Sequence, residues 1–334
     1  MNCILTGLGG RGLHWLNAVR AYDGLHAVAF VEPFEQNAER ATNEHGVPSD
    51  RIFKTLDEAI AAAPDAEFVL DVTPPKVHRE VAEKAFAAGL HVLGEKPLSE
   101  SYADALAVVA AGKAAGKTHM ITQNYRFGSQ PRTAARLVRE GLIGQPGQCD
   151  IRFYMPWADM AGSHYVTEPY MLINDMMVHH FDLLRYTIGE TPVSVQAITW
   201  NQPWGWHAGD ACHVILFEFA SGLRATHTCV GCAVGSQTQW NGDWRIEGPK
   251  GSIDMSKDGI FYSHLHRVEE KVERKIEGDD VPGGEKAILD EFLGALQNGG
   301  QPECNAEDNL QSLAMVFAAI KSAQEGRKVL LSEL

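Results

Sequence analysis

The sequence has no excess of positive charge and no long hydrophobic run. Its 334 residues include 29 Lys and Arg against 43 Asp and Glu, which gives a formal net charge of −14. Proteins that bind nucleic acid present a basic face, so this balance argues against a nucleic-acid partner and also disfavours an anionic membrane surface. No apolar run reaches the roughly 18 residues that a membrane-spanning helix needs. We interpret the acidic charge, which is spread along the chain, as a source of solubility.

Cysteine is scarce, and its spacing predicts no disulfide framework. The N-terminus enters a strand-like segment directly, without the charged and apolar regions of a signal peptide. Together these features predict a reducing, cytoplasmic location. Among six cysteines, only Cys229 and Cys232, with His213 and His227 nearby, suggest a metal site. A spacing of three in a strand sends the two cysteines to opposite faces, so we predict no metal.

The hydrolase motifs G-x-S-x-G and H-E-x-x-H are also absent, which leaves acyl transfer and zincin chemistry without support. The first 122 residues instead alternate between short apolar runs and Ala-rich segments. The strand-like runs are CILTG, HAVAFVE, FVLDVT, HVLGEK and THMITQ, and segments 78–89 and 100–116 have helical spacing. This alternation predicts an α/β domain over residues 1–122, with a doubly wound parallel sheet covered on both faces.

After residue 123 the pattern changes. Helices are predicted over 131–144, 170–189, 285–299 and 307–326. Most of the chain from 192 to 272 has strand-like alternation, and the ASGL turn is typical of a hairpin. We therefore predict a second domain over 123–334, of the α+β class, with a large and mostly antiparallel open sheet that binds substrate and makes oligomer contacts.

The segment GLGGRG places Gly7, Gly9 and Gly12 in a G-x-G-x-x-G pattern. A strand precedes it, a helical segment follows, and the next strand ends at Glu32, which is the context of a Rossmann dinucleotide site. Gly7 permits a tight turn, Gly9 lets the backbone approach a pyrophosphate, and Gly12 allows close packing. Glu32 can accept hydrogen bonds from ribose hydroxyls and would repel a 2′-phosphate, so we predict NAD rather than NADP.

The segment GEKPLSES follows the strand HVLGEK. Taken alone, Glu95 and Lys96 would be a salt-bridged surface loop. However, Lys96 lies at the carboxyl end of a strand, the edge where ligands bind in open α/β sheets. Pro97 restricts the Lys96 backbone to extended geometry, which gives its side chain a defined direction.

Asp175 and His179 are four residues apart in a predicted helix and so share one face. Asp182, three residues further, could orient His179. Histidine has an ordinary pKa of about 6.5, which suits a base that takes a hydroxyl proton while hydride leaves. A nearby lysine ammonium would stabilise the alkoxide-like transition state. His180 is the alternative base.

Four motifs in this order resemble the glucose–fructose oxidoreductase, inositol dehydrogenase and rhizopine-catabolism (Gfo/Idh/MocA) superfamily. They are GLGGRG, the run from DVTPPKVH to GEKPLSES, QNYRF, and NDMMVHHFDLLRYTIG, and they span nearly the whole chain. The resemblance implies that Lys96 is the catalytic lysine, with Asp175 and His179 at the reacting carbon. Met177 occupies a position where the family has glycine, and its thioether is expected to reshape the pocket.

The resemblance also guides the assignment of binding residues. The expected cofactor residues are Gly7, Leu8, Gly9, Gly10, Arg11, Gly12, Glu32, Thr73, Pro74, His78, Glu95 and Lys96. The expected substrate residues are Tyr125, Arg126, Trp157, Asp175, His179 and His180. Aromatic faces stack on sugar rings but also fill cores and interfaces, so at least two of four tryptophans are candidates to line a carbohydrate site: Trp157, Trp206, Trp240 and Trp244.

These features predict an NAD-dependent oxidoreductase that transfers hydride between nicotinamide and a secondary alcohol of a sugar, sugar derivative or cyclitol. One alternative is an NAD-dependent glycosidase that oxidises, eliminates, adds water and reduces back. A second is a non-catalytic nucleotide-binding regulator. In the family the open sheet makes the oligomer contact, so a homodimer or homotetramer is expected.

Overall fold

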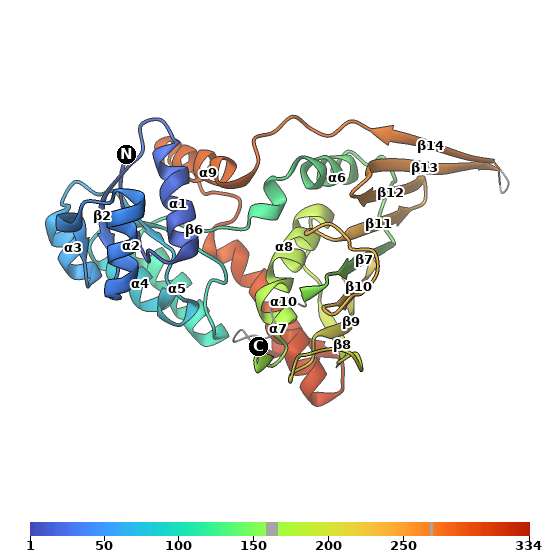
Figure 1. The fold of residues 1–334 in the computed structure, drawn as a ribbon. Coiled ribbons are helices and arrows are strands. Elements are labelled where there is room, and N and C mark those ends of the chain that lie inside the picture. Colours follow the sequence, from blue (N-terminus) through green and yellow to red (C-terminus); the bar gives the residue numbers. More distant parts are fainter. Residues whose placement is uncertain (158–165, 268–269) are drawn as a thin grey trace. The chain divides into compact units, whose positions relative to one another are not determined.

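A computed structural model describes residues 1–157, 166–267 and 270–334 of the chain (Figure 1). Contacts between Cα atoms divide it into two compact units. The first contains residues 1–123 and 283–310, and the second contains residues 124–282 and 311–334. The return of 283–310 to the first unit is a feature that the sequence analysis, which placed all of 123–334 in one domain, did not include.

The first unit is built on a six-stranded sheet in the order β3-β2-β1-β4-β5-β6. Its strands are β1 (Asn2–Thr6), β2 (His26–Val31), β3 (Ile52–Phe53), β4 (Phe68–Asp71), β5 (His91–Gly94) and β6 (His119–Ile121). All five pairings are parallel, which confirms the predicted doubly wound sheet. Every residue of β4 is buried, as expected for a strand covered on both faces. The two-residue β3 has no counterpart among the predicted strands.

Six helices belong to this unit. They are α1 (Gly10–Arg20), α2 (Glu35–His45), α3 (Leu56–Ala62), α4 (His78–Ala87), α5 (Tyr102–Ala115) and α9 (Gly284–Asn298). Helix α4 contacts both α3 and α5, and α1 lies beside α9 (Figure 1). The α5 helix starts at Ser101, whose hydroxyl accepts the Asp104 N–H at 3.0 Å, and it ends at Gly116 in the left-handed region.

The second unit is built on a nine-stranded sheet in the order β14-β13-β12-β11-β7-β10-β9-β8-β15. The strands are β7 (Gln148–Tyr154), β8 (Ser194–Trp200), β9 (Cys212–Glu218), β10 (Arg224–Val230), β11 (Asp243–Gly248), β12 (Gly251–Ser256), β13 (Gly259–Arg267), β14 (Glu270–Ile276) and β15 (Val329–Leu330). Only the β7–β10 pair is parallel. The predicted large, mostly antiparallel sheet is therefore confirmed.

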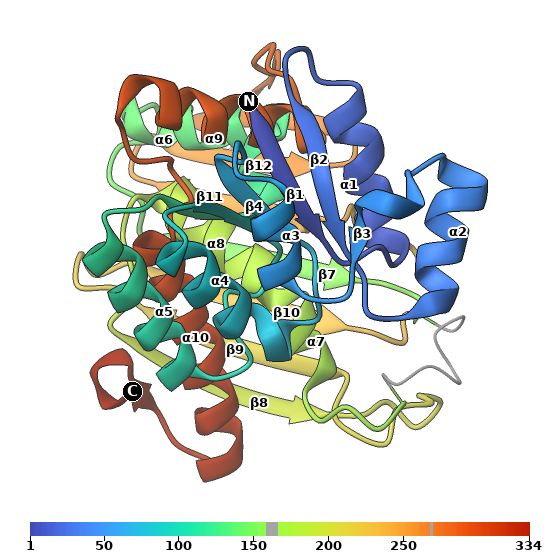
Figure 2. The ribbon, with the colours of Figure 1, turned by 90° about the vertical axis from the view of Figure 1, so that its left-hand side faces the viewer.

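Helices α6 (Ser129–Arg139), α7 (Met171–Asp175), α8 (Met177–Ile188) and the later part of α10 (Ala306–Glu325) belong to this unit. Figure 2 shows α8 lying across the sheet, and nearly every residue of α8 is buried. Phe181 of α8 meets Phe217 of β9 edge to face, with ring centroids 4.9 Å apart. Side chains that alternate along β7, such as Ile151 and Phe153, face the same core.

The single helix predicted over 170–189 is interrupted at Met176. Met176 has φ −99°, and its carbonyl oxygen accepts the His179 N–H at 3.1 Å. This three-residue hydrogen bond makes a tighter turn than the α-helical repeat. Asp175 therefore ends α7, whereas His179 lies on α8.

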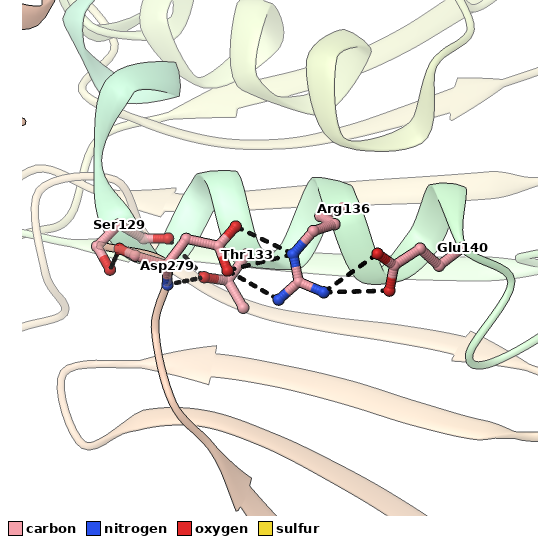
Figure 3. A network of polar contacts seen from close by, with 5 residues as sticks. All are labelled: Ser129, Thr133, Arg136, Glu140 and Asp279. Atoms are coloured by element: carbon pink, nitrogen blue, oxygen red, sulfur yellow. Dashed lines mark hydrogen bonds and ion pairs between the residues drawn. The ribbon is translucent and has the colours of Figure 1, made fainter. Parts of the chain in front are cut away.

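The segment after β14 is tied to α6 by a polar network (Figure 3). Asp279 accepts hydrogen bonds from Arg136, the shortest at 2.7 Å, and its N–H donates to the Thr133 hydroxyl at 2.7 Å. Elsewhere, all six cysteines are buried thiols. Within the described ranges, every helix is too short or too polar to cross a membrane.

Candidate functional site

The glycine-rich loop joins β1 to α1 in the first unit. Gly7 has φ +84°, and a Cβ atom there would lie 2.6 Å from the carbonyl oxygen of Val72. A Cβ on Gly12 would lie 1.9 Å from the carbonyl oxygen of Gly7, so the close packing expected at Gly12 is against the loop itself. A Cβ on Gly9 meets nothing within 4 Å. The backbone at Gly9, beside the N-terminus of α1, is thus accessible to a phosphate group.

Glu32 follows β2 and is bound to this loop. Its carboxylate accepts the Leu8 N–H at 2.8 Å and the Phe34 N–H at 3.0 Å, and the residue is 4% exposed. A carboxylate has about four lone-pair positions, so acceptor capacity remains for ribose hydroxyls. A pocket of about 520 Å³ lies beside Glu32, and its lining includes Glu35 and Glu39.

Glu95 is paired with the glycine loop. Its Oε1 atom accepts the Arg11 Nε–H at 2.6 Å and the Trp15 indole N–H at 2.7 Å. Arg11 also donates to Glu285 of α9 at 2.9 Å, and His14 lies 2.8 Å from the same Glu285 oxygen. The loop, the end of β5 and the start of α9 are therefore linked by charge. Glu95 is therefore a salt-bridge residue, as the simplest interpretation of the sequence suggested, and it pairs with Arg11 of the glycine loop.

His78 connects the turn after β4 with the segment after β5. Its Nε2 atom lies 2.8 Å from the Thr73 carbonyl oxygen, and its Nδ1 atom lies 2.9 Å from the Pro97 carbonyl oxygen. A neutral ring has one N–H and can donate to only one of them at a time. The Thr73 hydroxyl donates to Asp71 at 2.6 Å, which fixes the same turn, while the exposed Pro74 starts the next one.

Lys96 lies two residues beyond β5, in the segment that His78 holds. Its N–H donates to Glu95 Oε2 at 3.2 Å, and the bond to Pro97 is cis. The residue is half-buried. The first unit thus gathers the glycine loop, Glu32, Glu95 and Lys96 along the carboxyl ends of its central strands.

In the second unit, His179 lies in the first turn of α8 and is 7% exposed. The ring of Tyr125 stacks on its imidazole, with centroids 4.6 Å apart and planes inclined by 23°. Burial, and then the negative charge of Asp175, raise the pKa of the Tyr125 phenol far above its ordinary value. The fold therefore groups three of the predicted residues: Tyr125, Asp175 and His179.

Arg126 has a different environment. It is 4% exposed, and its guanidinium donates two hydrogen bonds to Asp182, one of them from Nε at 2.8 Å. The Ser312 hydroxyl donates to the same carboxylate at 3.1 Å. Asp182 therefore holds Arg126, and its suggested role in orienting His179 stays a prediction. Arg126 thus belongs to a buried ion pair of the second unit.

His180, predicted as a substrate residue and the alternative base, is fully buried. Its Nε2 atom lies 3.0 Å from the carbonyl oxygen of Trp240, and its Nδ1 atom lies 3.0 Å from Nε2 of His227. Burial lowers the pKa of His180 to about 4. Both ring nitrogens are engaged inside the core, so neither is available to take a proton from a substrate.

The four candidate tryptophans differ in their exposure and in their neighbours. Trp157 is 7% exposed, and its ring centroid lies 6.2 Å from that of Trp240, which is 54% exposed. Trp244 is buried, and its indole N–H donates to the Asn241 carbonyl at 2.6 Å. Trp206 is half-buried and stacks on His207. Trp157 and Trp240 are the pair that the fold brings together.

Two further expectations concern Met177 and metals. Met177 is fully buried and belongs to the hydrophobic core of the second unit. In the three described ranges, no group of three or more His, Cys, Asp or Glu could hold a metal ion.

Sequence reasoning missed the Arg11–Glu95 pair and the contact of His180 with His227. The strand alternation around His227 was the only local signal that its side chain faces inward.

Comparison with known families gives two matches. Residues 1–123 match the oxidoreductase family with an NAD-binding Rossmann fold, and residues 132–254 match the GFO/IDH/MocA C-terminal domain. The chain is similar to D-apiose dehydrogenase of Paraburkholderia graminis, with 26% identity over 99% of this chain and 89% of the relative. It is similar to inositol 2-dehydrogenase of Rhizobium meliloti, with 27% identity over 97% of each chain.

Two other similarities extend over the full length. The chain is 26% identical to 2,7-anhydro-N-acetylneuraminate hydratase of Escherichia coli, over 100% of this chain and 98% of that protein. A solved oxidoreductase of Agrobacterium radiobacter, in complex with NAD+, L-tartaric acid and magnesium, superposes with a TM-score of 0.87 at 20% identity, over 100% of this chain and 99% of that one. This last similarity concerns the fold.

Proposed function

The chain belongs to the GFO/IDH/MocA family of oxidoreductases, and from this premise we propose that it is an NAD-dependent dehydrogenase of a cyclic sugar, sugar derivative or cyclitol. The observation that carries the proposal is the stack of Tyr125 on the buried His179, with the Asp175 charge close by. A base, a hydroxyl and a carboxylate are thereby grouped around the start of α8. Relatives that are sugar and inositol dehydrogenases support the substrate class.

The first unit fits a dinucleotide. The open backbone at Gly9 and the N-terminus of α1 would hold the pyrophosphate, and Glu32 would hold the adenosine ribose. Glu32, Glu35 and Glu39 around the neighbouring pocket favour NAD over NADP. Thr73, Pro74 and His78 would line the nucleotide, with Glu95 near the nicotinamide ribose. A bound nicotinamide supplies the hydride acceptor.

Each catalytic side chain has a separate role. His179 accepts the hydroxyl proton of the substrate alcohol, a contribution of about 10²- to 10⁴-fold for a placed general base. Asp175 stabilises the positive charge that His179 then carries. The Lys96 ammonium favours the alkoxide-like charge at the reacting oxygen, an effect of about 10²- to 10³-fold for a comparable donor.

A screen for NADH formation tests this function. Monosaccharides, anhydrosugars, inositols and sugar acids would be offered with NAD, and absorbance at the reduced-nicotinamide band recorded. We expect turnover on at least one cyclic polyol. Lys96→Ala should lower kcat by roughly 100-fold or more and leave the fold intact, because it removes only the transition-state charge. Lys113→Ala, a change in an exposed lysine of α5, is the matched control and should keep full activity. An active Lys96→Ala variant would overturn the role of Lys96.

Cofactor choice has its own test. Glu32→Ser removes the carboxylate beside the predicted ribose while keeping a hydroxyl. We expect KM for NAD to rise about 10-fold or more and NADP to become usable, because the repulsion of the 2′-phosphate is lost. Glu39→Ser, at another residue that lines the same pocket, should have the smaller effect. An unchanged preference in Glu32→Ser would argue against this assignment.

One second function has a specific observation in its favour. The full-length similarity to a hydratase of an anhydro-sugar supports a redox-neutral cycle in which NAD stays bound. Such an enzyme would form no net NADH, and the product of an anhydro-sugar would gain one water by mass spectrometry. The third candidate function, a nucleotide-binding regulator, requires that the protein binds NAD but turns over none of the sugars, inositols and sugar acids in the NADH screen.

The expected assembly and location stay predictions. We propose a homodimer or homotetramer formed through the open face of the nine-stranded sheet, in the cytoplasm. Ile198 of β8, which is 63% exposed, and Val214 of the neighbouring β9 provide apolar side chains on that sheet. Light scattering of the intact protein should give two or four chain masses, and Ile198→Lys should lower that number. A monomer at micromolar concentration would contradict this expectation.

A further inference from the structure

Three buried histidines of the second unit form a continuous chain that ends on a backbone carbonyl. Nε2 of His213, on β9, lies 3.0 Å from Nδ1 of His227, on β10. Nε2 of His227 lies 3.0 Å from Nδ1 of His180, on α8. Nε2 of His180 lies 3.0 Å from the carbonyl oxygen of Trp240. None of the three histidines is more than 1% exposed.

The carbonyl at the end of the chain determines where the protons lie. A carbonyl oxygen only accepts, so Nε2 of His180 must carry the hydrogen. In a neutral ring Nδ1 of His180 is then an acceptor, and Nε2 of His227 must donate to it. The same reasoning makes Nδ1 of His227 an acceptor for Nε2–H of His213. One acceptor, the Trp240 carbonyl, therefore sets the tautomer of all three rings.

Burial keeps these rings neutral. It lowers the pKa of His180 to about 4, that of His213 to about 3, and that of His227 well below its ordinary value. A backbone carbonyl neither releases nor takes up a proton, so the chain has no proton donor or acceptor at its Trp240 end. It cannot serve as a proton wire from that end. What it can do is hold the Trp240 backbone at one position.

The turn that carries Trp240 is anchored on both sides of the residue. The Gly242 N–H donates to the Gln239 carbonyl at 3.0 Å, and the Gln239 side-chain amide donates to the Gly242 carbonyl at 3.0 Å. A Cβ on Gly242 would lie 3.2 Å from Cε1 of His180, so glycine allows the turn to approach the ring. Thr238 is bonded to Tyr154 of β7 in both directions.

The indole of Trp240 is nevertheless 54% exposed. Two other aromatic rings lie near it, those of Phe153 and Trp157, at centroid distances of 6.4 and 6.2 Å. His180, whose Nε2 atom bonds the Trp240 carbonyl, lies within the buried stretch of α8 and follows His179 in the chain. A large aromatic face that is open to solvent on a rigid backbone loses little entropy when it binds a ligand.

We propose that Trp240 is a specificity-determining residue whose indole stacks on the apolar face of a cyclic sugar or cyclitol, and that His180, His227 and His213 are positioning residues that hold this indole in place. The proposal rests on the proposed function, because it assigns the ring substrate to the same site. The negative face of an indole attracts the polarised C–H groups that a sugar ring presents on one side. An open-chain polyol has no such face.

Binding of ring and open-chain probes tests the stacking role. The probes are myo-inositol, 1,5-anhydro-D-glucitol and D-sorbitol, titrated calorimetrically into the NAD-saturated protein. We expect the two ring probes to bind at least about 10-fold more tightly than D-sorbitol, and Trp240→Ala to remove that difference. Trp240→Phe should retain part of it. Trp204→Ala, a tryptophan that is 58% exposed, is the matched control and should leave binding unchanged. Ring-probe binding that is absent in the natural protein, or unaffected in Trp240→Ala, overturns the proposal.

The positioning role needs a separate readout. In the ¹⁵N spectrum of histidine-labelled protein, all three rings should be neutral Nε2–H tautomers at pH 7, and an Nδ1–H tautomer at any of them contradicts the chain. His227→Phe should raise KM for the better-oxidised ring probe several-fold with kcat within about twofold. His213→Phe, one ring further from Trp240, should have a smaller effect. Equal effects on KM and kcat, or a larger one at His213, would exclude positioning of Trp240.

These outcomes separate the two proposals. Trp240-dependent binding of ring probes without NADH formation would remove the dehydrogenase function and leave the stacking site. NADH formation from a ring probe, with a KM that is unchanged in Trp240→Ala, would support the dehydrogenase function and remove the stacking site.

Discussion

Arg11 is the ion-pair partner of Glu95, with Nε and Oε1 2.6 Å apart. The Trp15 indole N–H donates to the same oxygen, and Glu95 is 8% exposed. Removal of this acceptor leaves the fully buried Trp15 indole N–H unsatisfied, at a cost of about 1–3 kcal/mol, whereas the Arg11 side chain, which is 42% exposed, can turn to water. The Glu95 carboxylate is thus both part of the expected cofactor site and a support for the glycine loop.

We therefore expect Glu95→Ala to lower the free energy of unfolding by about 1–3 kcal/mol, chiefly from the unsatisfied Trp15 N–H. Glu95→Gln keeps an acceptor oxygen at the same place and should cost less than half as much. Urea unfolding of both variants gives the comparison. Equal stability of the two variants would show that the hydrogen bonds to Arg11 and Trp15 contribute nothing.

The glycine loop offers a matched pair of substitutions. A Cβ on Gly12 would lie 1.9 Å from backbone, whereas a Cβ on Gly9 has no neighbour within 4 Å. Gly12→Ala should therefore destabilise the first unit by at least about 1–3 kcal/mol, as overpacking does. Gly9→Ala should unfold like the natural protein but bind NAD more weakly, because its methyl group occupies the approach of the phosphates. Calorimetry and thermal unfolding measure the two effects, and the opposite ranking would contradict the loop geometry.

Two Arg–Asp pairs differ chiefly in burial. The Arg126 and Asp182 side chains are 4% and 2% exposed, whereas those of Arg136 and Asp279 are 39% and 26% exposed. Figure 3 shows the second pair with its neighbours on α6. Breaking a buried pair leaves an uncompensated charge, so Asp182→Asn should cost about 3–5 kcal/mol. Asp279→Asn should cost about 1 kcal/mol or less. The free energies of unfolding in urea decide this, and comparable values would show that burial does not govern these pairs.

The buried histidines predict acid sensitivity. The pKa of His180 is lowered to about 4 and that of His213 to about 3, mainly by burial, from an ordinary value of 6.5. As pH falls below 6.5, the unfolded chain takes up protons that the folded protein does not. The free energy of unfolding should therefore decrease between about pH 6.5 and pH 4, by at most about 1.4 kcal/mol per pH unit for each histidine.

Urea unfolding at pH 7, 6 and 5 measures this slope. His213→Phe removes one of the buried imidazoles. The dependence of the unfolding free energy on pH should then become shallower by the contribution of at most one bound proton. His26→Phe, at an exposed position of β2, is the control and should leave most of the slope in place. A free energy of unfolding that is independent of pH over this interval would show that the three rings are not kept neutral by the fold.

Local patterns predicted most of the elements, because hydrophobic periodicity is a property of neighbouring residues. The glycine loop, Glu32 and the strands on either side of it could be placed from such patterns. The two-residue β3 is too short to produce a period. The break at Met176 was also missed, because the apolar run from 170 to 189 is compatible with one helix and the separate α7 depends on its surroundings.

The sequence by itself determined the class of the fold, the glycine loop and the choice of candidate catalytic residues, since these depend on residue type and short-range spacing. The tertiary structure alone decided their partners. Arg11 and Glu95 are 84 residues apart, and His180 and His227 are 47 apart. No local pattern encodes which ring nitrogen faces which acceptor, because that depends on how strands and helices from distant parts of the chain pack. For this reason His180, which neighbours His179 in sequence, became a buried link to Trp240 instead of a second base.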